Sequence, residues 1–437
     1  MNRIEKLIAE LCPNGVEWKK LGEVCDFQNG FAFKSNLFKD SGLPIIRITN
    51  LNGKNVDLND LKYFDPLDYK EDLEKFKINK GDILIAMSGA TKIGYYDVED
   101  IAYLNQRVGK FSPKKEILNN RFLYHFLSLN CQKIFSLYYG GTPPNLSSVQ
   151  LMDKISIPLP PLPIQEEIVK ILDTFTELEA ELEAELEARK KQYEYYRNKL
   201  LTPVEHKGRW YLNGKEVEWK KLGEIGTLIR GSGLQKKDFT DSGVGCIHYG
   251  QIYTYYGTFA DRTISFVSEE TAKNLKKVSK GDLVITSTSE NIEDVCKSVA
   301  WVGDNEIVTG GHTIILKHHE NAKFLSYYFQ TRNFFIQKIK YAKGTKVIDI
   351  SVGDLAKIPI PIPPLSEQER IVAILDKFDA LVNDLTSGLP AEIEARRKQY
   401  EYYRDKLLNF NRYNCKGDSC RGNCKDDSHR ENCKGDS

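Results

Sequence analysis

The chain has 437 residues, enough for two or three domains that each bury a core of their own. Its 62 lysines and arginines nearly balance 61 aspartates and glutamates, which excludes a protein that coats nucleic acid by bulk charge alone but leaves room for local basic faces. No run of about 18 apolar residues occurs, and the N-terminal MNRIEKLIAELCPNG has charges where a signal core would lie, so we expect a cytoplasmic protein that does not bind membranes.

The first 162 residues predict a domain of mixed α and β structure. Short apolar runs suited to strands alternate with turn dipeptides such as Asn29-Gly30. Residues 121–138 have apolar side chains at roughly helical spacing. The domain ends in ISIPLPPLP, residues 155–163, whose prolines exclude a helix there and make a stiff lead-in to the next segment. The predicted strands include Pro44–Ile48, Asp82–Ala86 and Arg107–Phe111.

An apolar stripe follows from Ile164 to Leu201 and predicts one helix of about 38 residues, roughly 57 Å long. Residues 177–188 within it are three identical ELEA tetrads, whose carboxylates would be repelled by phosphate groups. We therefore expect this helix to act as a spacer and docking surface and not to contact DNA. Each tetrad adds about 6 Å, so the number of tetrads is a candidate setting for the spacer length.

The second half of the chain repeats the plan of the first, which indicates two copies of one architecture. Between the repeated segments the two halves differ widely, as expected for one scaffold that carries two different recognition surfaces. The repeated segments are Val16–Glu23 with Val217–Glu224, Lys80–Ile85 with Lys280–Ile285, Pro160–Phe175 with Pro363–Phe378, and Glu187–Leu201 with Glu394–Leu408.

The second copy of the helix, residues 366–409, contains Gly388 and Pro390, which should break or kink it. A long apolar stripe must be covered, and the simplest cover is the other copy of the helix. Because a globular part precedes each helix, antiparallel pairing would set the two globular parts at opposite ends. The alternative is a core helix inside each domain.

We therefore predict an α+β fold in which two pseudo-repeated α/β globular domains are separated by two long antiparallel coiled-coil helices. The predicted boundaries are 1–162 and 203–364 for the globular domains, 163–202 and 365–409 for the helices, and 410–437 for a tail.

The cysteines fall into two groups. Five are scattered through the globular parts without CxxC pairs, as expected of reduced thiols. The other four lie with His429 in an imperfect nine-residue repeat from Asn414 to Ser437, a composition that can bind metal. The spacing is not that of paired ligands, and the repeat has almost nothing apolar to bury, so we expect a disordered tail without a role in function.

Loops rich in amide, hydroxyl and basic side chains recur at similar places in both halves. Asn and Gln can make paired hydrogen bonds to adenine edges, Arg and Lys to guanine, while Ser, Thr and Lys hold phosphates. Polar loops are ordinarily solvated turns, so the recurrence supports DNA binding more than any single residue does. The candidate DNA-binding residues of the first half are Lys34, Ser35, Arg47, Thr49, Asn50, Thr91, Lys92, Asn105, Gln106, Arg107, Thr142 and Asn145. Those of the second half are Arg230, Ser232, Gln235, Lys236, His248, Tyr249, Gln251, Tyr253, Thr288, Asn291, His312, Thr313, Lys343, Thr345 and Lys346.

Catalytic motifs are missing from the sequence. It has no GxxxxGK[ST] phosphate loop and no GxGxxG after a strand, and its histidines form neither an HExxH nor a triad-like pattern. Residues 142–145 are similar to the Asn-Pro-Pro-aromatic motif of amino-methyltransferases, but they lack its leading Asn and its aromatic residue, and we interpret them as a turn. We expect a protein that is not an enzyme, with no catalytic residue, no metal site and no cofactor of its own.

Two dissimilar globular parts, each closed by a proline-rich lead-in and a helix of one pattern, resemble the DNA specificity (S) subunit of type I restriction-modification systems. The pattern is Gln-x-x-Ile-Val-x-Ile-Leu-Asp followed by Glu-Ala-Arg-(Lys/Arg)-Lys-Gln-Tyr-Glu-Tyr-Tyr-Arg. It is carried by Gln165–Asp173 with Glu187–Arg197 and by Gln368–Asp376 with Glu394–Arg404. The resemblance covers the chain to about Phe410, and the terminal repeat departs from it.

The resemblance implies two target recognition domains, each of which reads one half of an interrupted, asymmetric sequence in double-stranded DNA. The helices would fix the gap and dock two modification subunits, adenine-N6 methyltransferases that bind S-adenosylmethionine and flip the base. Restriction subunits, with translocase and nuclease activity, would bring ATP and magnesium. No catalytic group is then expected in this chain.

Two other classes of protein stay open on the sequence. One is a coiled-coil adaptor without catalytic activity, whose variable parts bind proteins and not DNA. The other is a self-sufficient DNA methyltransferase or nuclease, which would need the cofactor loop and the catalytic motif that we do not find.

Overall fold

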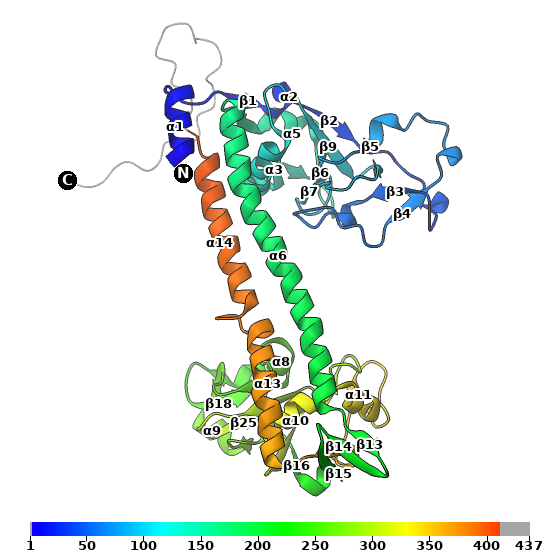
Figure 1. The fold of residues 1–437 in the computed structure, drawn as a ribbon, viewed down its shortest axis with the longest axis vertical. Helices are drawn as coiled ribbons and strands as arrows, with labels where there is room; N and C mark the ends of the chain where they lie inside the picture. Colours follow the sequence, from blue (N-terminus) through cyan, green and yellow to red (C-terminus); the bar gives the residue numbers. More distant parts are fainter. Residues whose placement is uncertain (1, 411–437) are drawn as a thin grey trace, which may run out of the picture. The chain divides into compact units, whose positions relative to one another are not determined.

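A computed structural model describes residues 2–410 and contains two compact units (Figure 1). Unit 1 comprises residues 2–179 and 395–410, and unit 2 comprises residues 180–394. The tail predicted for residues 410–437 lies outside the described residues except for Phe410. Each unit is described by itself.

Unit 1 begins with helix α1 and contains strands β1–β12. Its helices are α1 (Asn2–Leu11), α2 (Leu21–Val24), α3 (Asn120–Leu129), α4 (Cys131–Phe135) and α5 (Ser148–Lys154), with short 3-10 turns η1 (Ser35–Leu37), η2 (Ile48–Asn50), η3 (Pro66–Asp68) and η4 (Glu74–Phe76). Its strands are β1 (Trp18–Lys20), β2 (Cys25–Asn29), β3 (Leu43–Ile46), β4 (Lys62–Phe64), β5 (Lys77–Ile78), β6 (Ile83–Ala86), β7 (Ile93–Tyr95), β8 (Ala102–Leu104), β9 (Val108–Pro113), β10 (Tyr138–Tyr139), β11 (Asn145–Leu146) and β12 (Ser156–Pro158). The strands predicted at 44–48, 82–86 and 107–111 are thus confirmed as β3, β6 and β9, whereas the stretch 121–138 is not one helix but α3, α4 and the start of β10.

Unit 2 contains strands β13–β28. Its helices are α7 (Leu222–Ile225), α8 (Tyr249–Thr254), α9 (Glu269–Lys273), α10 (Ala322–Phe329), α11 (Arg332–Lys338), α12 (Val352–Leu355) and α13 (Leu365–Asn383), with one 3-10 turn η5 (Lys236–Asp238). Its strands are β13 (Val204–His206), β14 (Arg209–Leu212), β15 (Lys215–Lys221), β16 (Gly226–Arg230), β17 (Phe239–Thr240), β18 (Val244–Ile247), β19 (Phe259–Ala260), β20 (Ser265–Val267), β21 (Lys276–Val278), β22 (Leu283–Thr286), β23 (Thr288–Ser289), β24 (Ser298–Trp301), β25 (Ile307–Thr309), β26 (Thr313–His318), β27 (Ile348–Asp349) and β28 (Pro359–Ile362). Helices α6 (Leu162–Leu201) and α14 (Leu389–Leu408) each contribute residues to both units.

The two units share one sheet topology. Unit 1 has the strand orders β2-β9-β6-β7 and β4-β3-β8-β5, and unit 2 repeats them as β16-β26-β22-β24 and β20-β18-β25-β21, with β19 and β17 added at one edge of each sheet. In both units one pair in the second sheet is parallel, β3 with β8 and β18 with β25. The prediction of two repeated globular parts of mixed helix and sheet is therefore confirmed.

Strand β6 shows why the core forms where it does. Its residues ILIA are all buried, and their side chains alternate between two hydrophobic clusters. Ile83 and Ile85 face the cluster that contains α3 and α6, whereas Leu84 and Ala86 face the cluster around β3, β4 and β8. The period of two in a strand places one apolar layer on each side of the sheet. Strand β22 repeats this alternation in unit 2 with Leu283 and Ile285 opposite Val284.

The repeated segments of the sequence close each unit on itself. Strand β1 pairs with β12 and aligns Trp18 with Pro158, and β15 pairs with β28 and aligns Trp219 with Pro361. The proline-rich lead-ins are therefore short strands whose prolines lie where few ladder hydrogen bonds are needed. Helix α6 then starts at Leu162, and Pro163 occupies its first turn, where the missing N–H is tolerated.

A buried glutamine fixes each long helix to the adjacent globular core. Gln165 accepts a hydrogen bond from the Asn119 backbone N–H at 2.9 Å and donates to the Pro160 carbonyl at 2.7 Å. Gln368 accepts from the Asn321 N–H at 2.9 Å and donates to the Pro363 carbonyl at 2.9 Å. Both side chains are fully buried, so each glutamine holds the start of α3 or α10 against the lead-in.

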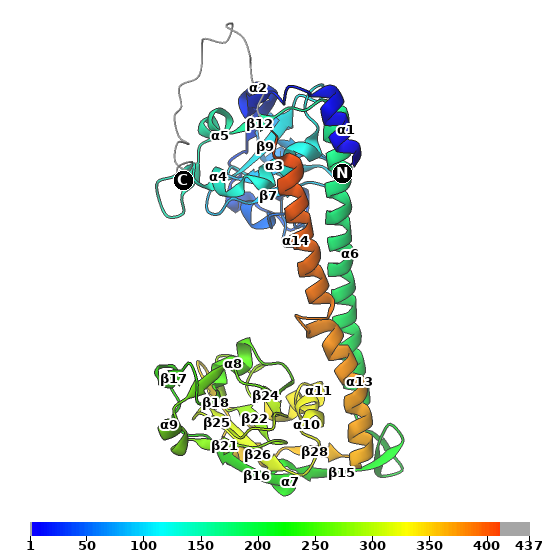
Figure 2. The same cartoon turned by 90° about the vertical axis from the view of Figure 1, so that its left-hand side faces the viewer.

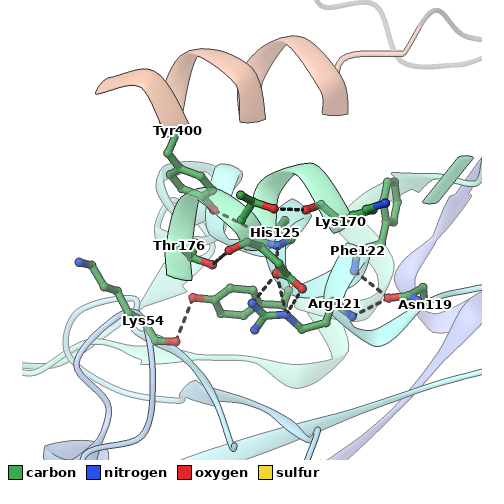
Figure 3. Close-up of polar contacts among 11 residues, drawn as sticks. Lys54, Asn119, Arg121, Phe122, His125, Lys170, Thr176 and Tyr400 are labelled. Atoms are coloured by element: carbon green, nitrogen blue, oxygen red, sulfur yellow. Dashed lines mark hydrogen bonds and ion pairs between the residues drawn. The ribbon is translucent and has the colours of Figure 1, made fainter. Parts of the chain in front are cut away.

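A buried polar network continues this attachment in unit 1 (Figure 3). Asp173 of α6 accepts hydrogen bonds from Arg121 Nε at 3.0 Å and faces His125 Nε2 at 2.8 Å. His125 is fully buried, and its Nδ1 lies 3.0 Å from the hydroxyl of Tyr400 on α14. The matched carboxylate of unit 2, Asp376, binds Lys323 Nζ at 2.8 Å and the Tyr327 hydroxyl at 2.7 Å.

The two copies of the helical pattern pair with each other in antiparallel sense. In unit 1, where α6 and α14 lie side by side (Figure 2), Phe175 stacks on Tyr403 at 5.2 Å and Glu179 binds Arg397 Nε at 3.0 Å. In unit 2, Phe378 of α13 stacks on Tyr196 of α6 at 5.4 Å. The predicted pairing and the predicted break at Gly388 and Pro390 are confirmed, since α13 ends at Asn383 and α14 starts at Leu389, with Pro390 in its first turn. The alternative, a core helix inside each domain, also holds in part, because Ile168 and Leu172 of α6 belong to the unit 1 core.

Candidate DNA interface

The parallel strand pair gathers polar residues at one edge in each unit. In unit 1, Ile46 of β3 aligns with Leu104 of β8, so Arg47 and Asn105 follow these strands at the same edge of the sheet. In unit 2, Ile247 of β18 aligns with Thr309 of β25, so His248 and the turn that leads to His312 share the matching edge. Parallel strands bring their carboxyl ends together, which explains why residues far apart in the sequence meet here.

Backbone hydrogen bonds join three loops at this edge of unit 1. The Met87 N–H donates to the Arg107 carbonyl at 2.9 Å, and the Leu146 N–H donates to the Met87 carbonyl at 2.9 Å. The structure therefore brings together the turn 105–107, the loop 87–92 and the segment 142–146. These loops carry the predicted residues Asn105, Gln106, Arg107, Thr91, Lys92, Thr142 and Asn145.

The same bonds recur in unit 2. The Ser287 N–H donates to the His312 carbonyl at 2.9 Å, and the Ile350 N–H donates to the Ser287 carbonyl at 2.9 Å. Strands β23 and β27 add the pairing of Thr288 with Asp349, which matches the bridge between Ser88 and Asn145 in unit 1. The loops are thus held by backbone groups, whatever side chains they carry.

Side chains of unit 2 form an aromatic and histidine cluster on these loops. The ring of Tyr249 lies 4.7 Å from the ring of His312 and 4.5 Å from that of His248. Thr288 Oγ1 lies 3.0 Å from His312 Nδ1, and the Tyr253 hydroxyl donates to the Thr288 carbonyl. His312 is exposed, so its side chain lies at the surface of the unit. A ring nitrogen and flat aromatic surface suit contact with base edges and the methyl group of thymine.

His248 lies beneath this surface. Burial lowers its pKa below the ordinary value, and the positive charge of Lys236 and the neighbouring His312 lower the pKa further. Its Nδ1 accepts a hydrogen bond from the Gly250 N–H at 3.2 Å, which suits a neutral ring. We therefore assign His248 to the support of helix α8 beside Tyr249, where it positions the cluster.

Sequence reasoning missed Asp349. Its carboxylate lies 3.3 Å from Arg230 Nη2, and its backbone pairs with both Thr288 and Lys343. The carboxylate can accept a hydrogen bond from a cytosine amino group. The signal was available, because the segment Asp349-Ile350-Ser351 stands in the second half where Asn145-Leu146-Ser147 stands in the first.

Besides His248, two further residues that were predicted to contact DNA support their loops instead, and their assignment is corrected here. Asn50 is 2% exposed, with its Oδ1 bound to the Arg47 N–H and its Nδ2 donating to the carbonyls of Asp57 and Asn59. Thr313 is fully buried and donates to the Gly310 carbonyl at 2.7 Å. Because these polar groups are satisfied inside the unit, they cannot reach a DNA base in this structure.

Four other predicted side chains have hydrogen-bond partners within their own unit while they keep some exposure. Gln251 binds the His248 N–H and Ser265 Oγ, Ser232 donates to the Asn274 carbonyl, Arg47 donates to the Asp60 carbonyl, and Asn291 binds Asp294. The remaining predicted residues are all exposed: Lys34, Ser35, Thr49, Gln235, Lys236, Lys343, Thr345 and Lys346. Lys343 Nζ binds Asp354 Oδ2 at 3.2 Å.

Within residues 2–410 no group of three or more His, Cys, Asp or Glu side chains is placed to hold a metal ion. No helix of the described chain is long and apolar enough to cross a membrane.

Comparison with known proteins gives a consistent result. The family model described as type I restriction modification DNA specificity domain matches residues 13–188 and again residues 214–395. A protein of Haemophilus influenzae assigned as a type I restriction enzyme specificity subunit is 32% identical over 93% of this chain and 98% of its own length. The EcoR124I/EcoR124II specificity subunit of Escherichia coli is 38% identical over 59% of this chain and 63% of its own length.

Solved structures show the same fold. The S subunit from M. genitalium matches with a TM-score of 0.54 and 16% identity, over 90% of this chain and 96% of that one. A chain in a solved structure of the type I R-M system matches with a TM-score of 0.56 and 18% identity, over 91% of this chain and 98% of that one.

Proposed function

The chain belongs to the type I restriction modification DNA specificity family, and we propose that each of its units reads one half of an interrupted, asymmetric sequence in double-stranded DNA. As a specificity subunit it recognises DNA for a restriction-modification complex and positions the modification and restriction subunits of that complex. We place the complex in the cytoplasm.

One observation supports two independent reading surfaces. The loops at the parallel strand edge are joined by the same backbone hydrogen bonds in both units, but the side chains at matched positions differ: Arg107 stands where His312 stands, Ser88 where Thr288 stands, and Asn145 where Asp349 stands. A fixed backbone with exchanged donors and acceptors suits two half-sites of different sequence.

The partners supply the chemistry in this proposal. Two modification subunits with adenine-N6 methyltransferase activity would bind S-adenosylmethionine, and restriction subunits would bind ATP and magnesium. This chain would bind no cofactor and catalyse no reaction. The target recognition domains would extend over 1–162 and 203–364, with spacer helices at 163–202 and 365–409.

The test is to express the chain with its modification subunit in a host that lacks both, and to map methylated adenines across the host genome. We expect a single interrupted motif that is methylated once on each strand, one adenine in each half. The matched control is the modification subunit alone, which should leave the genome unmethylated. A stable complex that adds no methylation would contradict the proposal and favour a protein adaptor.

A further inference from the structure

An exposed ion pair lies at the parallel strand edge of unit 2. Arg230 Nη2 lies 3.3 Å from Asp349 Oδ1, and the two side chains are 45% and 42% exposed. Arg230 is the last residue of β16, and Asp349 is the last residue of β27. An exposed pair contributes little to stability, because both charged groups are well solvated when they are apart. Its place among the loops of the candidate DNA interface points to a role in recognition.

The backbone fixes both residues of this pair. The Gly231 N–H donates to the Thr313 carbonyl at 2.9 Å, which holds the end of β16 against the start of β26. Residue 231 also lies so close to the Gly310 carbonyl that a side chain there would collide with it. The backbone of Asp349 exchanges two hydrogen bonds with that of Lys343, at 2.8 and 2.9 Å. The ion pair therefore presents one donor group beside one acceptor group from a fixed support.

The matched positions of unit 1 carry a different pair of side chains. The backbone bond that follows Arg230 recurs after Asn29, so these two residues stand at the same place in their units. Asn145 likewise stands where Asp349 stands. Asn29 Nδ2 donates to Ser148 Oγ at 3.3 Å. Two neutral amides thus replace two opposite charges while the backbone bonds stay the same, as expected for residues that read two different half-sites.

The spacing of the ion pair matches one edge of a G·C base pair. In the major groove the guanine O6 acceptor and the cytosine N4 donor are joined by a Watson–Crick hydrogen bond, so they lie about 2.9 Å apart. Arg230 and Asp349 offer the complementary donor and acceptor 3.3 Å apart. An arginine can also bind guanine N7 together with O6, which is the commonest specific contact to a base.

A T·A base pair offers an acceptor and a donor in the same order, but its outer groups do not fit. The methyl group of thymine stands where guanine has N7, so the second bond of the arginine is lost. On the other side the N7 acceptor of adenine would face the carboxylate of Asp349, and two acceptors repel each other. The G·C pair therefore suits this ion pair better than the T·A pair does.

We propose that Arg230 and Asp349 together read one G·C base pair in the major groove of the half-site that unit 2 recognises. Arg230 would donate to guanine O6 and N7, and Asp349 would accept from the cytosine N4 amino group. The arginine also neutralises the carboxylate, which phosphates would otherwise repel. This inference rests on the proposed function and adds the identity of one base pair to it.

The test uses the complex of the full chain with its modification subunit. Its affinity is measured for DNA duplexes that carry every single base-pair change in the methylated motif. The wild type should prefer G·C at one position of one half-site by about 5- to 150-fold, and Arg230→Ala should lose this preference and keep the others. Guanine replaced by 7-deazaguanine at that position lacks N7. This duplex should bind the wild type at least about fivefold more weakly than the unmodified one, whereas Arg230→Ala should bind both equally.

Two variants serve as controls. The double variant Arg230→Asn with Asp349→Asn has the residue types that the same backbone carries in unit 1, and it should also lose the G·C preference, which separates loss of reading from a folding defect. Lys280 Nζ forms an exposed ion pair with Asp304 Oδ1 at 2.7 Å in unit 2. Lys280→Ala removes this second ion pair and should keep the G·C preference.

The other outcomes separate the inference from the proposed function. If the wild type reads an interrupted motif and Arg230→Ala leaves every base preference unchanged, the G·C inference is wrong while the proposed function stands. If the wild type binds all sequences equally, both are wrong. If Arg230→Ala weakens binding to every duplex by the same factor, Arg230 contacts a phosphate and the inference is overturned.

Discussion

Arg107 of unit 1 and His312 of unit 2 lie at matched turns, and each carbonyl accepts a hydrogen bond from the loop that follows β6 or β22. Around them unit 1 places Ser88 and Asn145, whereas unit 2 places Thr288 and Asp349. The comparison shows that the frame of each reading surface is made of backbone groups. Because backbone hydrogen bonds do not depend on the side chain, the contents of the loops can change while the loops stay in place.

The attachment of the two cores to the long helices differs in chemistry as well. Asp173 holds an arginine and a buried histidine, and the histidine bonds in turn to Tyr400. Asp376 holds Lys323 and Tyr327. Unit 1 therefore has a buried histidine at this junction where unit 2 has a tyrosine, and the two junctions should respond differently to substitution.

The largest effect is expected from exchange of a whole reading surface. Replacement of residues 217–364 by the matching part of a related specificity subunit should change one half-site completely and leave the other unchanged, because the frame carries no base-specific group. Methylated motifs mapped across a genome provide the measurement. A change in both half-sites would show that the units do not read independently.

The junctions provide the next test. Asp173→Ala should lower the free energy of unfolding of unit 1 by about 3–5 kcal/mol, since Arg121 and His125 lose their acceptor in a largely buried place. Asp376→Ala should lower that of unit 2 by about 1–3 kcal/mol, because one neutral hydroxyl and one flexible lysine lose a partner. Hydrogen exchange of the amides in α3 and α10 reports each unit separately. Equal losses would remove the distinction between the junctions, and Asp173→Asn, which keeps an acceptor oxygen, should lie between wild type and the alanine variant.

Single residues at the matched turns should have smaller and separable effects. Arg107→Ala and His312→Ala should each reduce discrimination by about 1–3 kcal/mol, roughly 5- to 150-fold, at particular bases of one half-site only. Binding of the assembled complex to a panel of sites with single base changes measures this. The comparison of the two surfaces fails if both variants lose discrimination in the same half-site.

Lys346, an exposed lysine on the loop 343–347, should contribute to DNA binding by a similar amount for every sequence. Lys346→Ala is expected to weaken binding to every sequence by a similar small factor and to reduce the slope of affinity against salt concentration by about one. Titration of several sequences over a range of salt tests this. Sequence-dependent loss would instead assign Lys346 to base reading.

Low pH should destabilise unit 1 through His125, which lies where the globular core meets α6. Burial lowers the pKa of His125 below its ordinary value of 6.5 in spite of the hydrogen bond to Asp173. The unfolded chain then takes up a proton more readily than the folded one. The stabilisation that neutral His125 contributes to unit 1 is therefore complete above about pH 6.5 and is lost as the pH falls below that value. Tyr327 at the matched place of unit 2 does not titrate there. The difference in unfolding free energy between wild type and His125→Gln should shrink from pH 7 to pH 5, and a constant difference would contradict the assignment.

Much of the scaffold could be predicted because it depends on spacing. The apolar stripe from Ile164 to Leu201 predicted α6 to within two residues, and Gly388 with Pro390 predicted the break before α14. The end of α3 was not visible, since apolar spacing continues through Asn130, where the structure starts a new helix. Periodicity reports which side of an element is buried, but it does not report where the backbone turns.

The reading surfaces were predictable only at the level of loops. Asn50 and Thr313 are of residue types that often contact DNA at a surface, yet their polar atoms bond to backbone groups of their own loops. Sequence alone does not reveal whether the partner of an amide or hydroxyl is a base or a nearby carbonyl. His312 and Tyr249 lie close together because β18 pairs with β25, and no local sequence pattern predicts this long-range pairing.

The buried glutamines Gln165 and Gln368 have a consequence for how new specificities arise. Each bonds to a backbone N–H of the globular core and to a proline carbonyl of the lead-in, and Gln368 also donates to the Glu320 carboxylate of the core at 2.6 Å. The bonds common to both copies require from the core only one free backbone amide at the start of its helix. A chain built this way can acquire a foreign recognition module by recombination in a single step, with its mechanical coupling already in place.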